Sequence, residues 1–65
     1  MSSFSPQIEP GQFVRHPQRP DWGVGQVQSA IADRITVNFE NAGKVLVNAR
    51  VVSLVVLPGP PPGMT

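Results

Sequence analysis

The chain of 65 residues has no cysteine and no tyrosine, and each absence excludes a class of function. Without cysteine there can be no disulfide, no thiolate metal site and no cysteine nucleophile. Without tyrosine, the aromatic side chains are one tryptophan and three phenylalanines. A cage that reads methylated lysine needs several aromatic side chains around one cation. We therefore do not expect a reader of methylated lysine.

Charge is also scarce, because charged residues make up 14% of the sequence and the formal net charge is +1. Nucleic-acid-binding domains usually carry a concentrated basic excess on one face or along one helix. The four arginines are instead spread along the chain, although a fold could still gather them on one face. Composition alone therefore neither supports nor excludes nucleic-acid binding.

Long hydrophobic segments are missing as well. The most apolar run, residues 45–57, is interrupted by Asn48 and Arg50, and it is far shorter than the roughly 20 residues that span a bilayer. The N-terminal stretch MSSFSPQIEPG has neither the basic region nor the apolar region of a signal peptide. We therefore expect a soluble, cytoplasmic protein that does not contact a membrane.

The residues that carry chemistry do not form a catalytic or metal-binding pattern. His16 is the single histidine and has no carboxylate close to it in the sequence, so a structural hydrogen bond at the end of a strand is the preferred interpretation. The segment Gly23–Gly25 lacks the third glycine and the lysine of a phosphate-binding loop. We expect no enzyme activity, no metal, no cofactor and no small-molecule substrate. The acidic residues have no spacing that suggests acid–base chemistry: Glu9, Asp21, Asp33 and Glu40.

Pattern and punctuation divide the chain into a flexible leader (1–9), one domain (10–57) and a Pro-rich disordered tail (58–65). Phe4 and Ile8 in the leader could anchor it onto the domain. The segment 34–40 alternates best, with Ile35, Val37 and Phe39 on the inward face, which is typical of a half-buried strand. We predict five short strands, at 12–16, from 23 up to a connection at 30–33, at 34–40, at 44–47 and at 52–57, with a single helical turn at 48–51.

Glycine and proline determine the connections between these strands. Pro17 and Pro20 bracket a connector that we expect to be irregular. Gly23 and Gly25 fall on the inward face with Val27, where missing side chains let a strand coil sharply or a neighbour approach closely. The segment 41–43, Asn-Ala-Gly, predicts a tight turn with Asn and Gly in positions that tolerate positive φ. Together these features predict a small all-β barrel.

Three stretches then resemble known domains: PGQFVRHP followed by WGVGQV, VNFENAGKVLV, and a final VSLVVL. They resemble a family of short bacterial proteins classed as a domain of unknown function. More distantly, they are similar to the C-terminal Tudor-like domain of UvrD/PcrA-type repair helicases. A third similarity is to the RNA-polymerase-interacting domain of CarD and of the transcription-repair coupling factor. The connector of this chain, with Gln18 to Asp21 inserted before Trp22, is longer than in the helicase and CarD domains.

This resemblance implies a five-stranded SH3-like, Tudor-type barrel that binds a protein partner, RNA polymerase being the suggested candidate. The related domains use an exposed strand edge, where main-chain hydrogen bonds supply affinity. We expect a non-catalytic protein-interaction module, with partner-binding residues Arg15, Arg19, Trp22 and Asn41 near such an edge. The Trp22 ring could instead cap the open end of the barrel. A small nucleic-acid-binding barrel and a structural subunit of a larger complex remain alternative functions.

Overall fold

The computed structural model describes residues 8–60, and within this range the chain is all-β with no α-helix. A single 3₁₀ turn, η1, lies between the first two strands. The elements are β1 (Phe13–Arg15), η1 (Pro20–Trp22), β2 (Val24–Ile31), β3 (Arg34–Phe39), β4 (Gly43–Asn48) and β5 (Val55–Val56).

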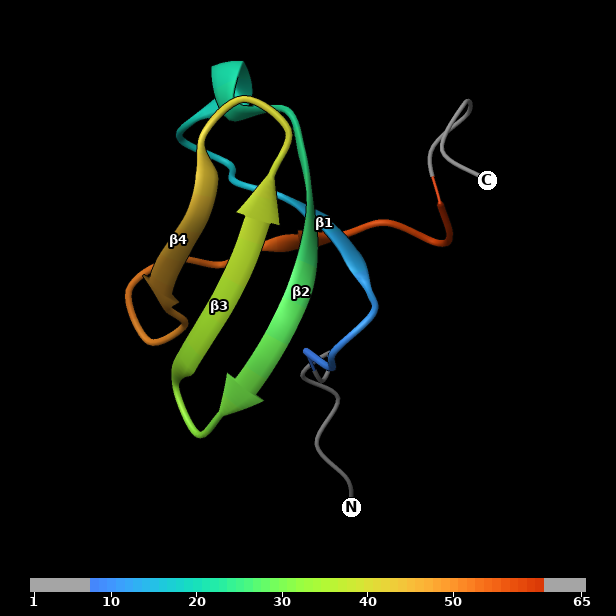
Figure 1. Cartoon of the computed structure of the whole chain (residues 1–65). Helices are drawn as coiled ribbons and strands as arrows, with labels where there is room; N and C mark the ends of the chain where they lie inside the picture. The colour runs from blue at the N-terminus through green and yellow to red at the C-terminus, as the bar shows by residue number, and fades with distance from the viewer. Residues whose placement is uncertain (1–7, 61–65) are drawn as a thin grey trace.

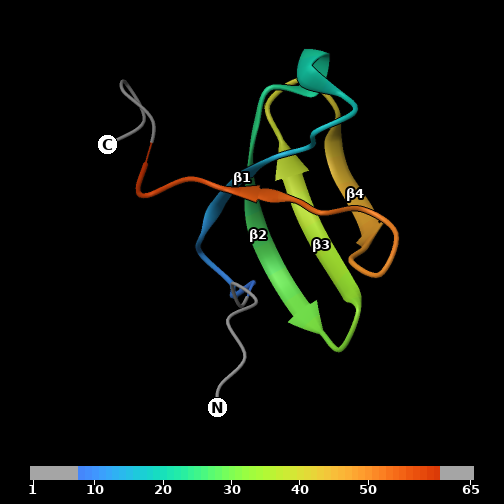
Figure 2. The same cartoon turned by 180° about the vertical axis from the view of Figure 1, so that it is seen from behind.

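All five strands belong to one antiparallel sheet in the order β4-β3-β2-β1-β5. The three long strands β2, β3 and β4 form a curved layer, and β1 and β5 cross behind that layer (Figures 1 and 2). The end strands β4 and β5 do not pair with each other in the described part of the chain. The sheet therefore folds over on itself but does not close into the barrel that the sequence pattern predicted.

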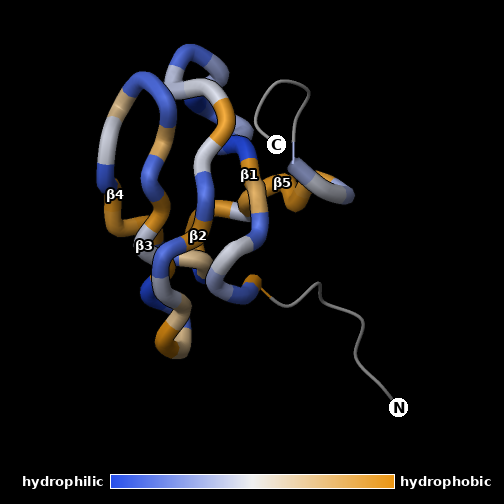
Figure 3. The backbone as a smooth tube through the Cα atoms, turned by 45° about the vertical axis from the view of Figure 1, so that its right-hand side comes forward, coloured by the Kyte–Doolittle hydropathy of each residue, from blue (hydrophilic) through white to orange (hydrophobic). Residues whose placement is uncertain are grey.

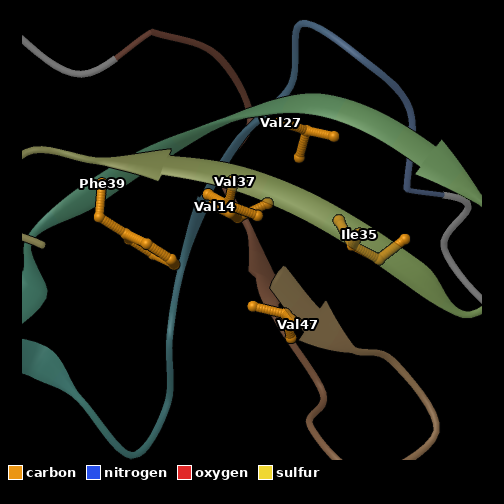
Figure 4. Close-up of a cluster of buried hydrophobic side chains, with 6 residues drawn as sticks. All are labelled: Val14, Val27, Ile35, Val37, Phe39 and Val47. Atoms are coloured by element: carbon orange, nitrogen blue, oxygen red, sulfur yellow. The ribbon is translucent and has the colours of Figure 1, made fainter. Parts of the chain in front are cut away.

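The core fills the space between the curved layer and the crossing strands (Figure 4). Burial alternates along β3, whereas β2 begins with two consecutive buried residues, Val24 and Gly25. The segment around β5 is more uniformly hydrophobic (Figure 3). This core is small, as expected for a short chain, which buries only about 60% of its unfolded surface. The cluster of buried side chains consists of Val14, Val27, Ile35, Val37, Phe39 and Val47.

The third strand was predicted best, because its three expected core residues are all buried and only its last residue was wrong. The helical turn after β4 is also confirmed, since the amides of Val51 and Val52 both donate to the carbonyl oxygen of Asn48. The strand predicted at 44–47 is longer and spans Gly43–Asn48. The strand predicted at 52–57 was wrong in length. Only Val55 and Val56 pair with β1, because β1 itself is three residues long and offers few partners.

Strand β2 extends further than predicted, to Ile31, and it contains an irregularity. Val27 pairs with Val37, and Ser29 pairs with Thr36, so Gln28 is an extra residue in the ladder. Such a bulge bends the strand and shifts the alternation of its side chains by one residue. Ala30 consequently lies opposite the buried Ile35, on the core side, rather than in the connection where we expected it.

The hairpin between β2 and β3 has only two loop residues, Ala32 and Asp33, because Ile31 pairs directly with Arg34. Ala32 has a φ of 53°, and it is the only non-glycine residue with positive φ in the described range. Tight two-residue hairpins favour this geometry because it matches the twist of the strands. No residue pattern predicted this turn, since alanine is not a residue that prefers positive φ.

The two glycines predicted to share an inward face have different roles. Gly25 is buried opposite Phe39, and a Cβ atom on Gly25 would overlap Val37 and lie 2.7 Å from Phe39 Cδ1. Gly23 precedes β2, has a φ of 77°, and lies against the side chain of Glu40. The prediction of close approach is therefore confirmed at Gly25, whereas the inward strand position was wrong for Gly23.

The leader was predicted to anchor through Phe4 or Ile8. Ile8 packs against the core, and the Gly11 amide donates to the Val27 carbonyl oxygen at 2.8 Å. Phe4 and residues 1–7, like residues 61–65 of the predicted Pro-rich tail, lie outside the described residues. None of the described segments forms a helix with the length and hydrophobicity that crossing a membrane would require.

Replacing Gly25 by alanine should destabilise the fold, because the new methyl group overlaps the core. Overpacking of this kind typically costs about 1–3 kcal/mol, which exceeds the gain of about 0.4–1 kcal/mol from a stiffer unfolded chain. Urea denaturation followed by circular dichroism measures the change. Gly59→Ala is the matched control, since a Cβ there meets no atom within 4 Å and φ is not positive. Equal stability of the two variants would contradict the packing described for Gly25.

Replacing Ala32 by glycine should stabilise the protein by up to about 1 kcal/mol. The left-handed conformation costs an L-residue roughly 1–2 kcal/mol, and the added freedom of the unfolded chain returns only part of that. The same substitution at Ala42, where φ is not positive and the methyl group packs against the core, should destabilise. Thermal denaturation of both variants gives the comparison. A lower melting temperature for Ala32→Gly would contradict the turn geometry.

Candidate interaction surfaces

The connector between β1 and β2 ends in the 3₁₀ turn η1, where the sequence predicted an irregular lead-in. Pro20 occupies the first position of the turn, where a residue without an N–H loses nothing. The Trp22 amide donates to the Arg19 carbonyl oxygen at 3.0 Å, and the Gly23 amide donates to that of Pro20 at 3.2 Å. The turn η1, stabilised by these bonds, lies at one end of the sheet, above the loop between β3 and β4 (Figure 1).

Trp22 is half-buried and closes this end of the core. Its ring centroid lies 5.2 Å from that of Phe39 and 5.0 Å from that of His16, distances that are favourable for tilted aromatic pairs. The guanidinium carbon of Arg19 lies 5.6 Å from the Trp22 ring centroid, within the range of a cation–π contact. The Trp22 ring therefore covers one end of the core, as expected if it acts as a cap. Arg19 makes the cation–π contact with this ring.

His16 has the structural role expected from the sequence. It is 9% exposed, and its Nδ1 atom accepts a hydrogen bond from the Gln18 amide at 3.1 Å. This bond holds the chain as it turns away from β1 toward η1. Within residues 8–60, no three histidine or acidic side chains come together as a metal site would require.

Asn41 joins the loop after β3 to η1. Its amide donates to the Trp22 carbonyl oxygen at 3.0 Å, and its Nδ2 atom donates to the Asp21 carbonyl oxygen at 3.1 Å. The prediction that Asn41 supplies a positive φ was wrong, because only Gly43 in this turn has one, of 72°. Asn41 was selected as a partner-binding candidate, and in the structure its side chain connects two segments of the chain.

Three of the four candidate residues, Arg19, Trp22 and Asn41, therefore lie together, and we call them the η1 cluster. Arg15 lies elsewhere. It is exposed on β1, opposite Val24 of β2 and Val55 of β5. Strand β1 is separated from β4 by β2 and β3 in the sheet order. Arg15 therefore lies outside the η1 cluster, across the ladder from Val24, which follows Trp22 by two residues.

Strand β4 forms one edge of the sheet, and within residues 8–60 only β3 pairs with it. We call its outer side the β4 edge. Val47 points into the core, whereas Leu46 is 64% exposed. An unpaired strand edge with an exposed apolar side chain is a template for pairing with another chain. The expected open edge has two candidates in the sheet order, β4 and β5, and β4 is the longer, with six residues against two.

From the sequence, Glu40 was considered only as an acidic residue without a catalytic spacing, and its structural role was missed. Its Oε1 atom accepts a hydrogen bond from the Val24 amide at 3.1 Å, while the Glu40 amide donates to the Val24 carbonyl oxygen at 3.0 Å. A Cβ atom on Gly23 would lie 2.6 Å from this Oε1. The glycine therefore makes room for the carboxylate. The only sequence signal was an acid placed directly after a strand, with a partner 16 residues away.

Truncating Trp22 to alanine should cost about 2–4 kcal/mol, somewhat less than for a fully buried aromatic residue. Arg19→Ala removes only an exposed cation–π contact, so its cost should stay within about 1 kcal/mol. Urea denaturation followed by circular dichroism compares the two variants without relying on tryptophan fluorescence. If Trp22→Ala were as stable as Arg19→Ala, Trp22 would not be closing the core.

Comparison with known proteins gives one match. The model of a family described as "Protein of unknown function (DUF3553)" matches residues 8–57, which include every strand and all four candidate residues. No curated protein and no solved structure matches the chain. Because the match covers most of the 65 residues, the chain belongs to the family of proteins of unknown function DUF3553.

Proposed function

We propose that this protein is a non-catalytic interaction module that binds an extended segment of a protein partner along the β4 edge. One observation carries the proposal: β4 is a six-residue strand at the end of the sheet order, and it exposes Leu46 beside its open side. A partner strand added there would gain main-chain hydrogen bonds along β4. Its alternate side chains would lie beside Lys44, Leu46 and Asn48.

The η1 cluster extends this surface at the beginning of β4. Asn41 stands two residues before Gly43, and it is hydrogen-bonded to the segment that carries Trp22. Tryptophan and arginine are the residue types that most often contribute strongly to protein interfaces. The proposed surface therefore includes Arg19, Trp22 and Asn41. It omits Arg15, which lies on β1 and is not part of the β4 edge.

We further assign the fold to the SH3-like, Tudor-type group of small barrels, in an open form. The supporting features are the strand order, the long bulged β2, and the single helical turn that joins β4 to β5. The resemblance to the helicase and CarD domains makes bacterial RNA polymerase the first partner to test. Binding to bacterial RNA polymerase would place the protein in the cytoplasm.

Nucleic-acid binding is the second candidate function, and the Arg19–Trp22 pair is the observation that favours it. Proteins that bind single strands combine stacking aromatics with a basic groove. The arginines, however, are divided: Arg19 lies at η1, whereas Arg34 and Arg50 lie at the other end of β3 and β4. Arg50 also faces Asp33, with Nε and Oδ2 3.8 Å apart. Protein binding is therefore the better-supported function.

Substituting Leu46 by lysine should weaken partner binding at the β4 edge at least fivefold without unfolding the protein. The side chain is mostly exposed, so the fold should lose little, whereas a lysine on an edge strand opposes pairing with another strand. The measurement is retention of purified bacterial core RNA polymerase on immobilised wild-type and variant protein. Val51→Lys introduces the same charge at a residue that is 78% exposed and lies outside β4, and it serves as the control.

Loss of binding in both variants would show that charge alone is responsible, and retention in both would exclude the β4 edge. If the wild type retained no polymerase, the polymerase would be abandoned as partner. Titration with single- and double-stranded DNA and RNA at low and high salt tests the second candidate. Binding that falls steeply with salt would favour nucleic acid.

A further inference from the structure

A shallow depression of about 330 Å³ lies on the face of the sheet that is turned away from the core. This volume is at the lower limit for small-molecule sites, which span about 300–1,000 Å³, so it suits one side chain better than a larger ligand. Val24 is buried here although it does not belong to the core cluster, and it gives the depression an apolar component. The lining residues are Val24, Gln26, Asn38, Phe39, Glu40 and Gly43.

The carboxylate of Glu40 is held in place at this depression by three features. Its Oε1 atom accepts the Val24 amide, its own amide donates to the Val24 carbonyl oxygen, and the missing side chain of Gly23 leaves the space that the carboxylate occupies. A side chain fixed in this way loses little rotamer freedom when a ligand binds. The second carboxylate oxygen takes no part in the bond to Val24.

The neighbouring amides add acceptors. The Nε2 atom of Gln26 donates to the Gly11 carbonyl oxygen at 3.4 Å, so one of its two side-chain N–H groups is engaged, while its Oε1 atom can accept. Asn38 pairs with Gln26 across the ladder and lies on the same face. The depression therefore offers amide oxygens as acceptors beside one full negative charge.

No arginine or lysine within residues 8–60 forms an ion pair with Glu40, since the ion pair in that range joins Arg50 and Asp33. Lys44 stands opposite Asn38 in the ladder and therefore lies on the same face. Arg15 stands opposite Val24 in the ladder and lies on this face as well. Binding of a cation here would thus be favoured by Glu40 and opposed by Lys44 and Arg15.

We propose that this depression receives an arginine side chain of the protein partner. A guanidinium has five N–H donors in a planar fork and no acceptor, which complements a fixed carboxylate beside amide oxygens. The aliphatic part of the arginine can lie against Val24 and over Gly43, where the missing side chain leaves open space. This assignment rests on the interaction function proposed above, and it defines the chemistry that the partner must present.

The test is a titration of the ¹⁵N-labelled full-length protein with Nα-acetyl-arginine methylamide at low salt, followed by amide chemical shifts. Saturable shifts should concentrate at residues 23–26 and 38–43. The citrulline analogue, which has the same shape but no charge, should produce no saturable shift there. Glu40→Gln keeps an Oε1 acceptor for the Val24 amide but removes the charge. It should weaken binding about tenfold, as expected for one charge-assisted hydrogen bond.

Lys44→Gln provides the opposite control, because removing the like charge should strengthen binding of the arginine probe about twofold. Circular dichroism establishes that both variants are folded. If Glu40→Gln did not fold, the comparison of arginine with citrulline on the wild type would still decide the matter. Equal shifts with both probes, shifts spread over the whole surface, or no saturable binding at millimolar probe would each overturn the assignment.

The same variants separate this assignment from the β4 edge. If the partner failed to bind the Leu46→Lys variant but still bound the Glu40→Gln variant, the interaction function would stand and the arginine site would be excluded. If the arginine probe bound saturably at Glu40 and the partner still bound the Leu46→Lys variant, the arginine site would stand and the β4 edge would be excluded.

Discussion

The contact between Gly25 and Phe39 determines how the rest of the sheet is arranged. These two residues pair across β2 and β3, and the missing side chain of Gly25 gives Phe39 and Val37 the space they occupy. With that space available, Val14 of β1 can also lie in the same cluster (Figure 4). A side chain at position 25 would force the strands apart, because protein interiors are close-packed and transmit such strain.

Through Phe39, the Gly25–Phe39 pair is also connected to residues at the surface. Phe39 ends β3, and its ring contacts Trp22, which in turn lies beside His16 and under Arg19. The end of the core and the η1 cluster are thus one packed unit. A partner that contacts Trp22 would meet a ring that is already held by its neighbours, so little conformational entropy would be lost on binding.

The loop that follows Phe39 carries both proposed binding features. Glu40 reaches back to Val24, Asn41 reaches to η1, and Gly43 begins β4. Because the loop is hydrogen-bonded to β2 and η1, the depression at Glu40 and the start of the β4 edge have a fixed relation to each other. A partner segment lying along β4 and presenting an arginine would find both sites in one rigid arrangement, which favours selectivity over a single contact.

Local pattern was sufficient for the elements whose period is regular. The alternation of residues 34–40 identified the buried face of β3, and the lapse of alternation after Val47 identified the helical turn. Pattern failed where one residue breaks the period. The bulge at Gln28 shifts the phase of β2, and alanine at position 32 adopts a positive φ that only the tight hairpin imposes. Neither the bulge nor the positive φ can be recognised from the amino-acid composition.

The sequence by itself determined the all-β class, the inward face of β3 and the close approach at Gly25, since these depend on side-chain period and on a missing side chain. It also selected Arg19, Trp22 and Asn41 as candidates. Only the tertiary structure decided that these three are joined by contacts around η1, that β4 is an open edge, and that Glu40 is fixed against Gly23 and Val24. Those facts depend on contacts between residues far apart in the chain, and such contacts follow from strand order and register rather than from local preference.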